Sequence, residues 1–200
     1  MELRLHRFVS RTRVEGPGER ACVWVQGCSI RCPGCAVPTA WSTDGGYSVS
    51  VDELARRILT PRPVEGVTFV GGEPFEQAAE LATLGEVLRD RGLSVVTFTG
   101  HTLEDLLAEP SGGSTELLAA TDLLIDGPYR QDLADLSRPW VGSSNQRYHF
   151  LTNRYRHLEP FLESIPNRLE LRLQPNGTVM VNGMGDFEKT RALLTADYCL

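Results

Sequence analysis

Short, continuous apolar runs alternate along the chain with longer segments in which apolar residues recur every three or four positions. The continuous runs predict buried strands, because each is short and ends at a glycine-bearing turn; they are 21–26, 67–70, 93–99 and 122–125. The periodic segments predict helices at 50–59, 75–91, 102–108 and 115–120. Strands that alternate with helices in this way form βα units and a mostly parallel sheet.

The C-terminal part has a different pattern. A further strand is expected at 149–152. Beyond it, the turn-forming sequence Pro-Asn-Gly at 175–177 separates two strand-like segments, which predicts a hairpin of 169–174 with 178–181. A helix is expected at 186–195.

The length of 200 residues limits the fold class. A complete eightfold barrel typically takes about 250 residues, which is more than this chain has. We therefore expect an α/β fold, a partial (β/α)5-6 barrel of mainly parallel strands with a small C-terminal hairpin and helix. Residues 1–200 are expected to form a single domain.

Composition and charge narrow the function classes. Acidic residues outnumber basic ones by 26 to 20, a net charge of −6, which argues against binding nucleic acid or an anionic membrane. No apolar stretch approaches the roughly 20 residues that cross a bilayer, and the first residues lack a signal-peptide core. We expect a cytoplasmic protein, in which thiols stay reduced and a cysteine cluster points to a metal or to catalysis.

Three of the five cysteines, Cys28, Cys32 and Cys35, follow the first predicted strand with the spacing C-x3-C-x2-C. Three thiolates on one loop suit a four-iron cluster that keeps one iron open to substrate. A structural zinc site needs four protein ligands, and the fourth would have to be Cys22, Cys199 or His6. An iron–sulfur cluster, a zinc site and a chance grouping all remain open on the spacing alone.

The predicted strands end in polar, glycine-bearing turns. These are Gln26-Gly27, Gly71-Gly72, Thr99-Gly100 and Asp126-Gly127. Because chemistry in parallel α/β sheets sits at the carboxyl ends of the strands, the four turns predict a site along one edge of the sheet, next to the cysteines.

The cysteine spacing resembles the signature of the radical S-adenosylmethionine (SAM) enzymes. Glu15-Gly-Pro-Gly-Glu-Arg20 and the segment before Cys28 resemble the N-terminal part of the glycyl-radical-enzyme activases, and Gly71-Gly72-Glu73-Pro74 resembles the SAM-binding motif. The segment 139–147 resembles the small anaerobic ribonucleoside-triphosphate reductase activating proteins. The resemblance runs from about residue 13 to about residue 150.

This resemblance implies a [4Fe-4S] cluster on the three cysteines and S-adenosyl-L-methionine on its open iron. Glu73 would accept hydrogen bonds from the SAM amino group, since charge-assisted bonds are the strong ones. The other implied SAM-binding residues are Gly71, Gly72, Pro74, Thr99 and Asp126, the last two by position. Asn145, Gln146 and Arg147 would line the entrance or hydrogen-bond a loop.

The implied reaction is reductive cleavage of SAM to a 5′-deoxyadenosyl radical, which takes a hydrogen atom from a glycine of a partner glycyl-radical enzyme. A partial barrel leaves one side open, which suits a loop of another protein. The electron would come from a low-potential donor such as flavodoxin or ferredoxin.

The chain departs from the activase pattern after the third cysteine. Ala36-Val37 stand where the activases usually have an aromatic residue and an asparagine, and Gly34 stands where many radical SAM families have an aromatic residue. This departure motivates a second hypothesis, a radical SAM enzyme that modifies a peptide or a small molecule in a specialised pathway. A non-catalytic zinc-binding module is the third.

Overall fold

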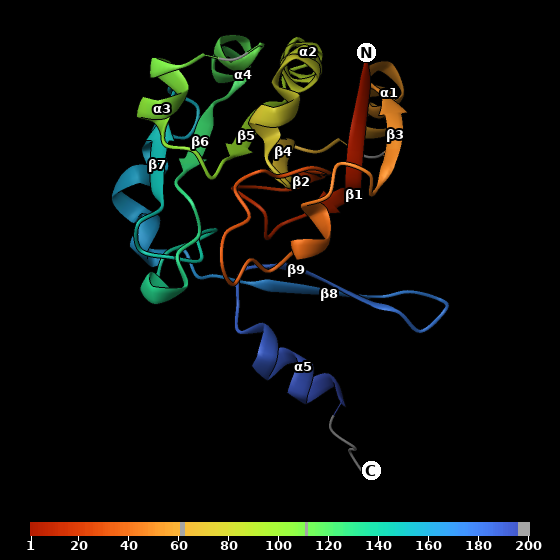
Figure 1. Ribbon diagram of the computed structural model, residues 1–200, viewed down its shortest axis with the longest axis vertical. Coiled ribbons are helices and arrows are strands. Elements are labelled where there is room, and N and C mark those ends of the chain that lie inside the picture. The colour runs from red at the N-terminus through yellow and green to blue at the C-terminus, as the bar shows by residue number, and fades with distance from the viewer. Residues whose placement is uncertain (61–62, 111, 196–200) are drawn as a thin grey trace.

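The computed structural model describes residues 1–60, 63–110 and 112–195. Its main sheet has seven strands in the order β3-β1-β2-β4-β5-β6-β7, and a separate two-stranded sheet is formed by β8 and β9 (Figure 1). The strands are β1 (Glu2–Thr12), β2 (Arg20–Val25), β3 (Tyr47–Ser50), β4 (Gly66–Gly71), β5 (Ser94–Phe98), β6 (Leu123–Asp126), β7 (Arg147–Phe150), β8 (Leu169–Leu173) and β9 (Val179–Gly183).

Five α-helices and four short 3-10 helices connect the strands in the described part of the chain. The α-helices are α1 (Val51–Leu59), α2 (Ala78–Arg89), α3 (Leu103–Ala108), α4 (Ser114–Ala120) and α5 (Phe187–Thr195). The 3-10 helices are η1 (Pro38–Ala40), η2 (Pro74–Gln77), η3 (Gln131–Leu133) and η4 (Arg156–Ser164).

The four central strands, β2, β4, β5 and β6, run parallel to one another. The remaining strands of the main sheet, β1, β3 and β7, pair antiparallel with their neighbours at the two sides. All four carboxyl ends of the parallel strands therefore lie along one edge. The α/β fold with a mostly parallel central sheet is confirmed; four strands are parallel, and antiparallel strands flank them.

Successive residues of the central strands face opposite sides of the sheet and enter two different cores. On one side Val23, Phe69 and Val95 pack against helices α1, α2 and α4. On the other side Val96 and Ile125 pack with residues of the 140–165 segment, such as Trp140. Both faces are covered, which explains why these strands read as continuous apolar runs.

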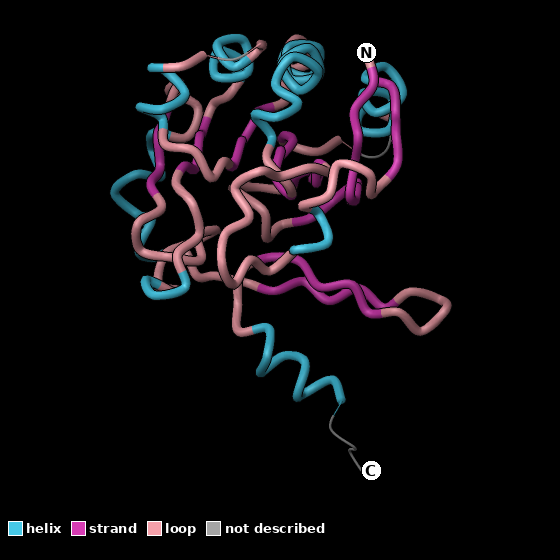
Figure 2. The backbone as a smooth tube through the Cα atoms, viewed as in Figure 1, coloured by secondary structure: helices cyan, strands magenta, loops and turns pink. Residues whose placement is uncertain are grey.

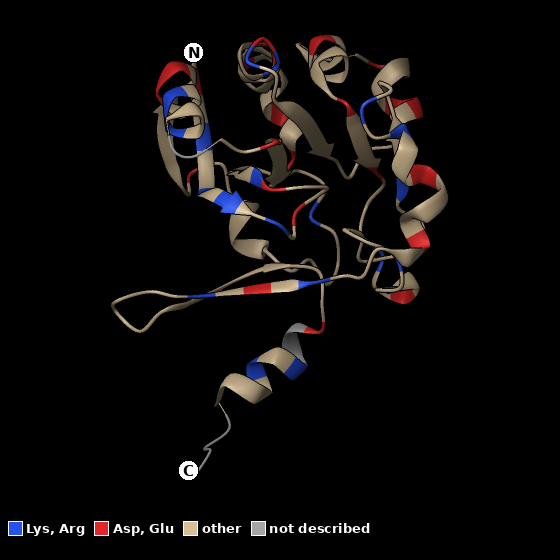
Figure 3. Ribbon diagram, turned by 180° about the vertical axis from the view of Figure 1, so that it is seen from behind, with Lys and Arg blue, Asp and Glu red and all other residues tan. Residues whose placement is uncertain are grey.

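Charged residues gather on the helices, the side strands and the loops (Figure 3), whereas β4 and β5 contain none. The N-termini of α1 and α3 are capped by side chains: the hydroxyl of Ser50 accepts a hydrogen bond from the Glu53 N–H, and that of Thr102 accepts one from the Asp105 N–H. Within the described residues, no helix combines the length and the apolar character needed to span a membrane.

The structure adds two strands that the sequence analysis did not predict, β1 and β3. In β1, Leu3, Leu5 and Val9 are buried, but the alternation is interrupted at Arg7-Phe8 and the register shifts twice against β2. The predicted helix at 75–91 begins instead with the 3-10 turn η2, followed by α2. The predicted hairpin and final helix are present as β8, β9 and α5; in Figure 2 the hairpin lies below the main sheet and α5 extends away from it. The single domain over 1–200 stays a prediction.

Replacing Leu124 of β6 tests the central core. Leu124 is fully buried in the helix-facing core, so Leu124→Ala should lower the free energy of unfolding by about 2–5 kcal/mol. The matched control is Leu107→Ala, whose side chain is 65% exposed and whose effect should stay within about 0.5 kcal/mol. Anaerobic urea denaturation measures both; equal effects would contradict this assignment of the core.

Candidate active site

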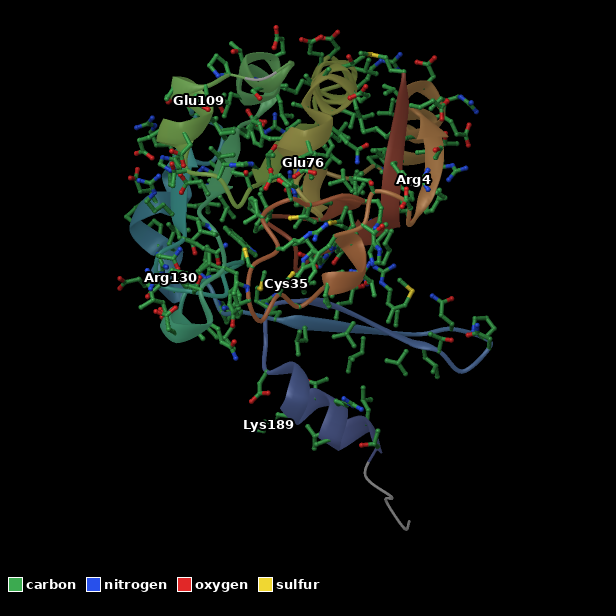
Figure 4. All side chains as sticks on the ribbon, viewed as in Figure 1. Arg4, Cys35, Glu76, Glu109, Arg130 and Lys189 are labelled. Atoms are coloured by element: carbon green, nitrogen blue, oxygen red, sulfur yellow. The ribbon has the colours of Figure 1, made fainter. Side chains whose placement is uncertain are left out.

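One pocket at the carboxyl ends of the parallel strands gathers most of the residues that the sequence analysis singled out. Its lining residues are Cys28, Ile30, Cys32, Cys35, Trp41, Val70, Gly71, Gly72, Glu73, Pro74, Phe98, Thr99, Gly100, Gly127, Tyr129, Gln146 and Met184. In Figure 4, Cys35 lies on the side of the sheet away from α1 and α2, next to the β8–β9 hairpin. The cysteine loop and the Gly71–Pro74 turn therefore share one cavity.

The cysteine loop leaves β2 at Gln26 and is closed by backbone hydrogen bonds. The N–H of Gly27 donates to the carbonyl of Ala40 at 2.8 Å, and that of Cys28 donates to Trp41 at 3.1 Å. The Gln26 side-chain amide donates to two more carbonyls across the loop, those of Thr39 and Ser42. The loop thus has a defined shape although it contains little regular structure.

The three thiols face backbone N–H donors. Cys28 receives them from Ile30 and Arg31, and Cys32 from Tyr129. The Val37 N–H lies 3.4 Å from Sγ of Cys35. Burial raises the pKa of the Cys28 and Cys32 thiols, and these donors oppose that rise. Such donors stabilise a thiolate, and hydrogen bonds to sulfur tune the potential of a cluster, so this donor set fits an iron–sulfur centre.

The Gly71–Glu73 turn lies directly against the start of the cysteine loop. The N–H of Gly72 donates to Val25 and that of Glu73 to Gly27, both at 2.8 Å, which continues the parallel pairing beyond the strands. A Cβ on Gly72 would lie 2.0 Å from the Gly27 carbonyl oxygen, so only glycine fits there. Gly71 has a φ of +107° and its backbone also packs closely on β2.

Glu73 is buried, with 1% of its surface exposed, and its carboxylate joins the ends of two strands. Oε1 accepts hydrogen bonds from the Thr99 hydroxyl at 2.8 Å and the Phe75 N–H at 3.0 Å, and Oε2 accepts the Gly100 N–H at 2.9 Å. Burial raises the pKa of Glu73, and the three donors oppose the rise. A carboxylate has about four acceptor positions, so about one remains for a ligand amino group.

Asp126, expected to touch SAM, lies outside the pocket. Its fully buried carboxylate accepts the Leu103 N–H at 2.7 Å and two bonds from Arg147, with His149 Nε2 at 2.9 Å. Burial raises the pKa of Asp126, but these partners outweigh it and hold the pKa below its usual value. Arg147 also pairs with the exposed Glu104, whose pKa falls to about 2.

Asn145 and Gln146 hold the loop after β6. Asn145 donates to the Pro128 carbonyl at 2.8 Å, and Gln146 accepts the Gly142 N–H at 2.9 Å while its body lines the pocket. Of the three residues expected at the entrance, Gln146 therefore lies at the pocket. Asn145 hydrogen-bonds a loop, and Arg147 holds Asp126.

Sequence reasoning missed Tyr129 and Met184, which both line the pocket. Gly34 has a φ of +77°, and a Cβ there would lie 3.3 Å from the Tyr129 ring. Tyr129 thus supplies an aromatic ring beside the position where the cysteine motif lacks one. Its one signal in the sequence is its place just beyond the Asp126-Gly127 turn, at the end of a predicted strand. Ala36 is exposed, and neither it nor Val37 lines the pocket.

The ligands considered for a zinc site do not join the three thiols. Cys22 is fully buried in β2 and packs with Val9 and Trp24, and His6 lies 3.1 Å from Gln26 Oε1. Cys199 lies outside the described residues. Thiolates on one zinc ion approach to about 4 Å, because each Zn–S bond is about 2.3 Å. Within the described residues, no group of three Cys, His, Asp or Glu is arranged to hold a single ion.

Comparison with known proteins agrees with this site. A family described as a 4Fe-4S single cluster domain matches residues 14–149. The anaerobic ribonucleoside-triphosphate reductase-activating proteins of Escherichia coli and Vibrio cholerae are 29% and 31% identical, over 73% and 74% of this chain and 97% of each relative. The pyruvate formate-lyase-activating enzyme of Clostridium pasteurianum is 33% identical over 61% of this chain, which spans about half the length of that relative.

A mostly parallel α/β sheet with three thiols and a Gly-Gly-Glu-Pro turn in one pocket defines a radical SAM enzyme. This chain belongs to the 4Fe-4S single cluster domain family and, within it, to the radical SAM activases. The predictions of an enzyme, of a [4Fe-4S] cluster and of S-adenosyl-L-methionine are thereby confirmed.

Replacing Gly72 tests the contact between the turn and the cysteine loop. Gly72→Ala should push the turn away from Gly27 and weaken SAM binding at least tenfold, about 1.4 kcal/mol. Equilibrium dialysis of the anaerobic protein measures the affinity. The matched control is Gly112→Ala, because a Cβ at Gly112 meets nothing within 4 Å. Unchanged SAM affinity in Gly72→Ala would contradict the close approach.

Replacing Arg147 tests its support of Asp126. Arg147→Met leaves a buried carboxylate with fewer partners and should cost about 1–3 kcal/mol at pH 7, since Arg147 is itself partly exposed. Folding lowers the pKa of Asp126, so its ionised carboxylate stabilises the folded protein at pH values above the unfolded pKa of about 3.9. This contribution is lost as the pH falls through the lower pKa of the folded state. The difference between the two proteins should therefore shrink in acid, as urea denaturation at several pH values would reveal.

The control for this series is Arg130→Met. Arg130 pairs with Asp132 where both side chains are more than half exposed, so its loss should leave the free energy of unfolding nearly unchanged at all of these pH values. A loss in Arg147→Met that stayed constant down to the lowest pH would show that Asp126 is not the group involved.

Proposed function

We propose that this enzyme installs a glycyl radical in a partner protein, most specifically an anaerobic ribonucleotide reductase. The observation that carries the proposal is the shared pocket of the cysteine loop and the Gly71–Pro74 turn. It is supported by the reductase-activating relatives, which are matched over 97% of their own length.

The cluster ligands in this proposal are Cys28, Cys32 and Cys35. When bound, the cluster and SAM together supply a 5′-deoxyadenosyl radical that removes a hydrogen atom from the substrate. The protein contributes N–H donors to the three sulfurs and a wall of Val70 and Phe98, which keeps water away from the reacting groups.

SAM would lie against the Gly71–Pro74 turn, where the backbone is free of side chains. The remaining acceptor position of Glu73 suits the amino group of SAM, and Tyr129 offers a ring for its adenine. Thr99 acts by holding Glu73, and Asp126 acts by anchoring the strand ends through Arg147. In this proposal both are positioning residues.

A protein substrate suits a sheet that does not close into a full barrel, because one side can then admit a loop of the partner. The partner would present a backbone glycine to the pocket, and a low-potential donor such as flavodoxin or ferredoxin would supply the electron. The alternative, a radical SAM enzyme acting on a free peptide or small molecule, draws support from exposed Ala36, which leaves the loop surface without the aromatic contact usual in activases.

Electron paramagnetic resonance distinguishes the two functions. Anaerobic incubation with SAM, reductant and the organism's own anaerobic ribonucleotide reductase should give a glycyl radical signal on the reductase. Deoxyadenosine formation that depends on a peptide or small molecule, with no glycyl signal from any glycyl-radical enzyme, would instead establish the alternative.

The ligand assignment predicts which cysteines retain iron. The anaerobically prepared protein should hold about four irons per chain, and Cys28→Ala, Cys32→Ala or Cys35→Ala should each abolish cluster retention and deoxyadenosine formation. Iron analysis and the visible absorption spectrum measure retention. Cys22→Ala is the control, because Cys22 is buried in a separate apolar cluster and should be dispensable for iron. One zinc per chain and no iron would overturn the assignment.

A further inference from the structure

One wall of the pocket comes from a distant part of the sequence. Among the described residues, Met184 is the single pocket-lining residue beyond 146, and it directly follows β9. The family match ends at residue 149, so Met184 lies outside it. The β8–β9 hairpin lies on the side of the sheet away from α1 and α2, next to Cys35 (Figures 1 and 4).

A few contacts anchor this hairpin to the body of the protein. The Gly183 N–H donates to Oε1 of buried Glu15 at 2.8 Å, and the Thr12 hydroxyl donates to Oε2 of Glu170 at 2.5 Å. Met180 packs on the cluster formed by Val9, Cys22 and Trp24. The segment that places Met184 in the pocket is therefore bonded to the glutamate of the Glu15-Gly-Pro-Gly sequence.

The docked hairpin leaves buried polar atoms without partners. Asn182 is 2% exposed, and neither its Nδ2 nor its Oδ1 has a hydrogen-bond partner. Nε of Arg7, whose guanidinium also reaches the Val181 carbonyl, is likewise unpartnered. Each such atom opposes docking, because in water it would be hydrogen-bonded. The docked position thus combines favourable contacts with buried polar atoms that oppose it.

The pocket is also small while Met184 lines it. Its volume is about 170 Å³. Pockets that enclose drug-sized ligands usually measure about 300–1,000 Å³, and SAM is a ligand of that size.

We propose that the segment 182–184 is a plug: with the hairpin docked, Met184 occupies space that SAM and the substrate glycine need, and the hairpin must withdraw to admit them. The inference rests on the proposed function. The withdrawn state is the one that binds, so SAM affinity reports the fraction of molecules in which the hairpin has withdrawn.

Two variants of neighbouring residues should move the plug in opposite directions. Gly183→Ala, at a φ of +94°, places a Cβ 2.9 Å from Cβ of Val14 in the body of the protein and 2.1 Å from the Arg168 carbonyl oxygen beside the start of β8. The clash with Val14 should release this end of the hairpin from the body. Asn182→Leu replaces the unpartnered amide with an apolar group of similar shape, which should favour docking. Leu173→Ala, at a hairpin position 77% exposed, is the control and should change neither measurement.

The first measurement uses the cluster-free protein and needs no activity. The alkylation rate of Cys28, Cys32 and Cys35 by a bulky maleimide, followed by peptide mass spectrometry, should rise in Gly183→Ala and fall in Asn182→Leu. The second measurement is the SAM affinity of the cluster-loaded protein. Gly183→Ala should bind about tenfold more tightly if the withdrawn state holds about 10% of the parent molecules.

The outcomes separate this inference from the proposed function. Alkylation rates that are equal in all variants, or that change in the same direction in Gly183→Ala and Asn182→Leu, would overturn the plug. A missing glycyl radical alongside opposite alkylation shifts would overturn the proposed function and leave the plug in place. Met184→Ala should raise SAM affinity while the amides of 179–183 stay protected from hydrogen exchange, because the hairpin remains docked. Weaker SAM binding in Met184→Ala would show that Met184 is part of the ligand site instead.

Discussion

The contact between the Gly72 backbone and the Gly27 carbonyl is the constraint on which the site depends. It brings the turn after β4 against the loop after β2, so that a cosubstrate held by one lies beside the thiols of the other. Two 2.8 Å hydrogen bonds fix the approach, and a single added methyl group would prevent it. The parallel sheet supplies the geometry, because neighbouring parallel strands end at the same edge.

The second support is a layer of side-chain bonds behind the pocket. Glu73 joins the ends of β4 and β5, and Asp126 joins the end of β6 to Arg147 on β7. Both carboxylates are buried, and both are bonded by the protein itself. Polar residues at these strand ends therefore keep the edge rigid, and the surfaces left for ligands are largely backbone, aromatic and aliphatic.

How much could be predicted from the sequence depended on whether a feature is local. The central strands were predictable because burial on both faces makes them continuously apolar, and the cysteine spacing, with the Gly71–Pro74 motif, pointed to the right chemistry. Strand β1 was missed because its alternation of apolar and polar residues breaks after His6, where the register against β2 shifts. Long-range contacts determine three other features: the hydrogen bond between Glu73 and Thr99, the burial of Asp126 behind the pocket, and the position of Met184 in the pocket wall. No local pattern encodes such contacts.

The cysteine loop is shaped almost entirely by main-chain groups: carbonyls close it, and amide hydrogens face its sulfurs. The exposed side chain that follows the third thiol, Ala36, is therefore little constrained by the inorganic centre. Substitutions on this outward surface of the loop could change which protein is recognised without altering the groups that face the sulfurs.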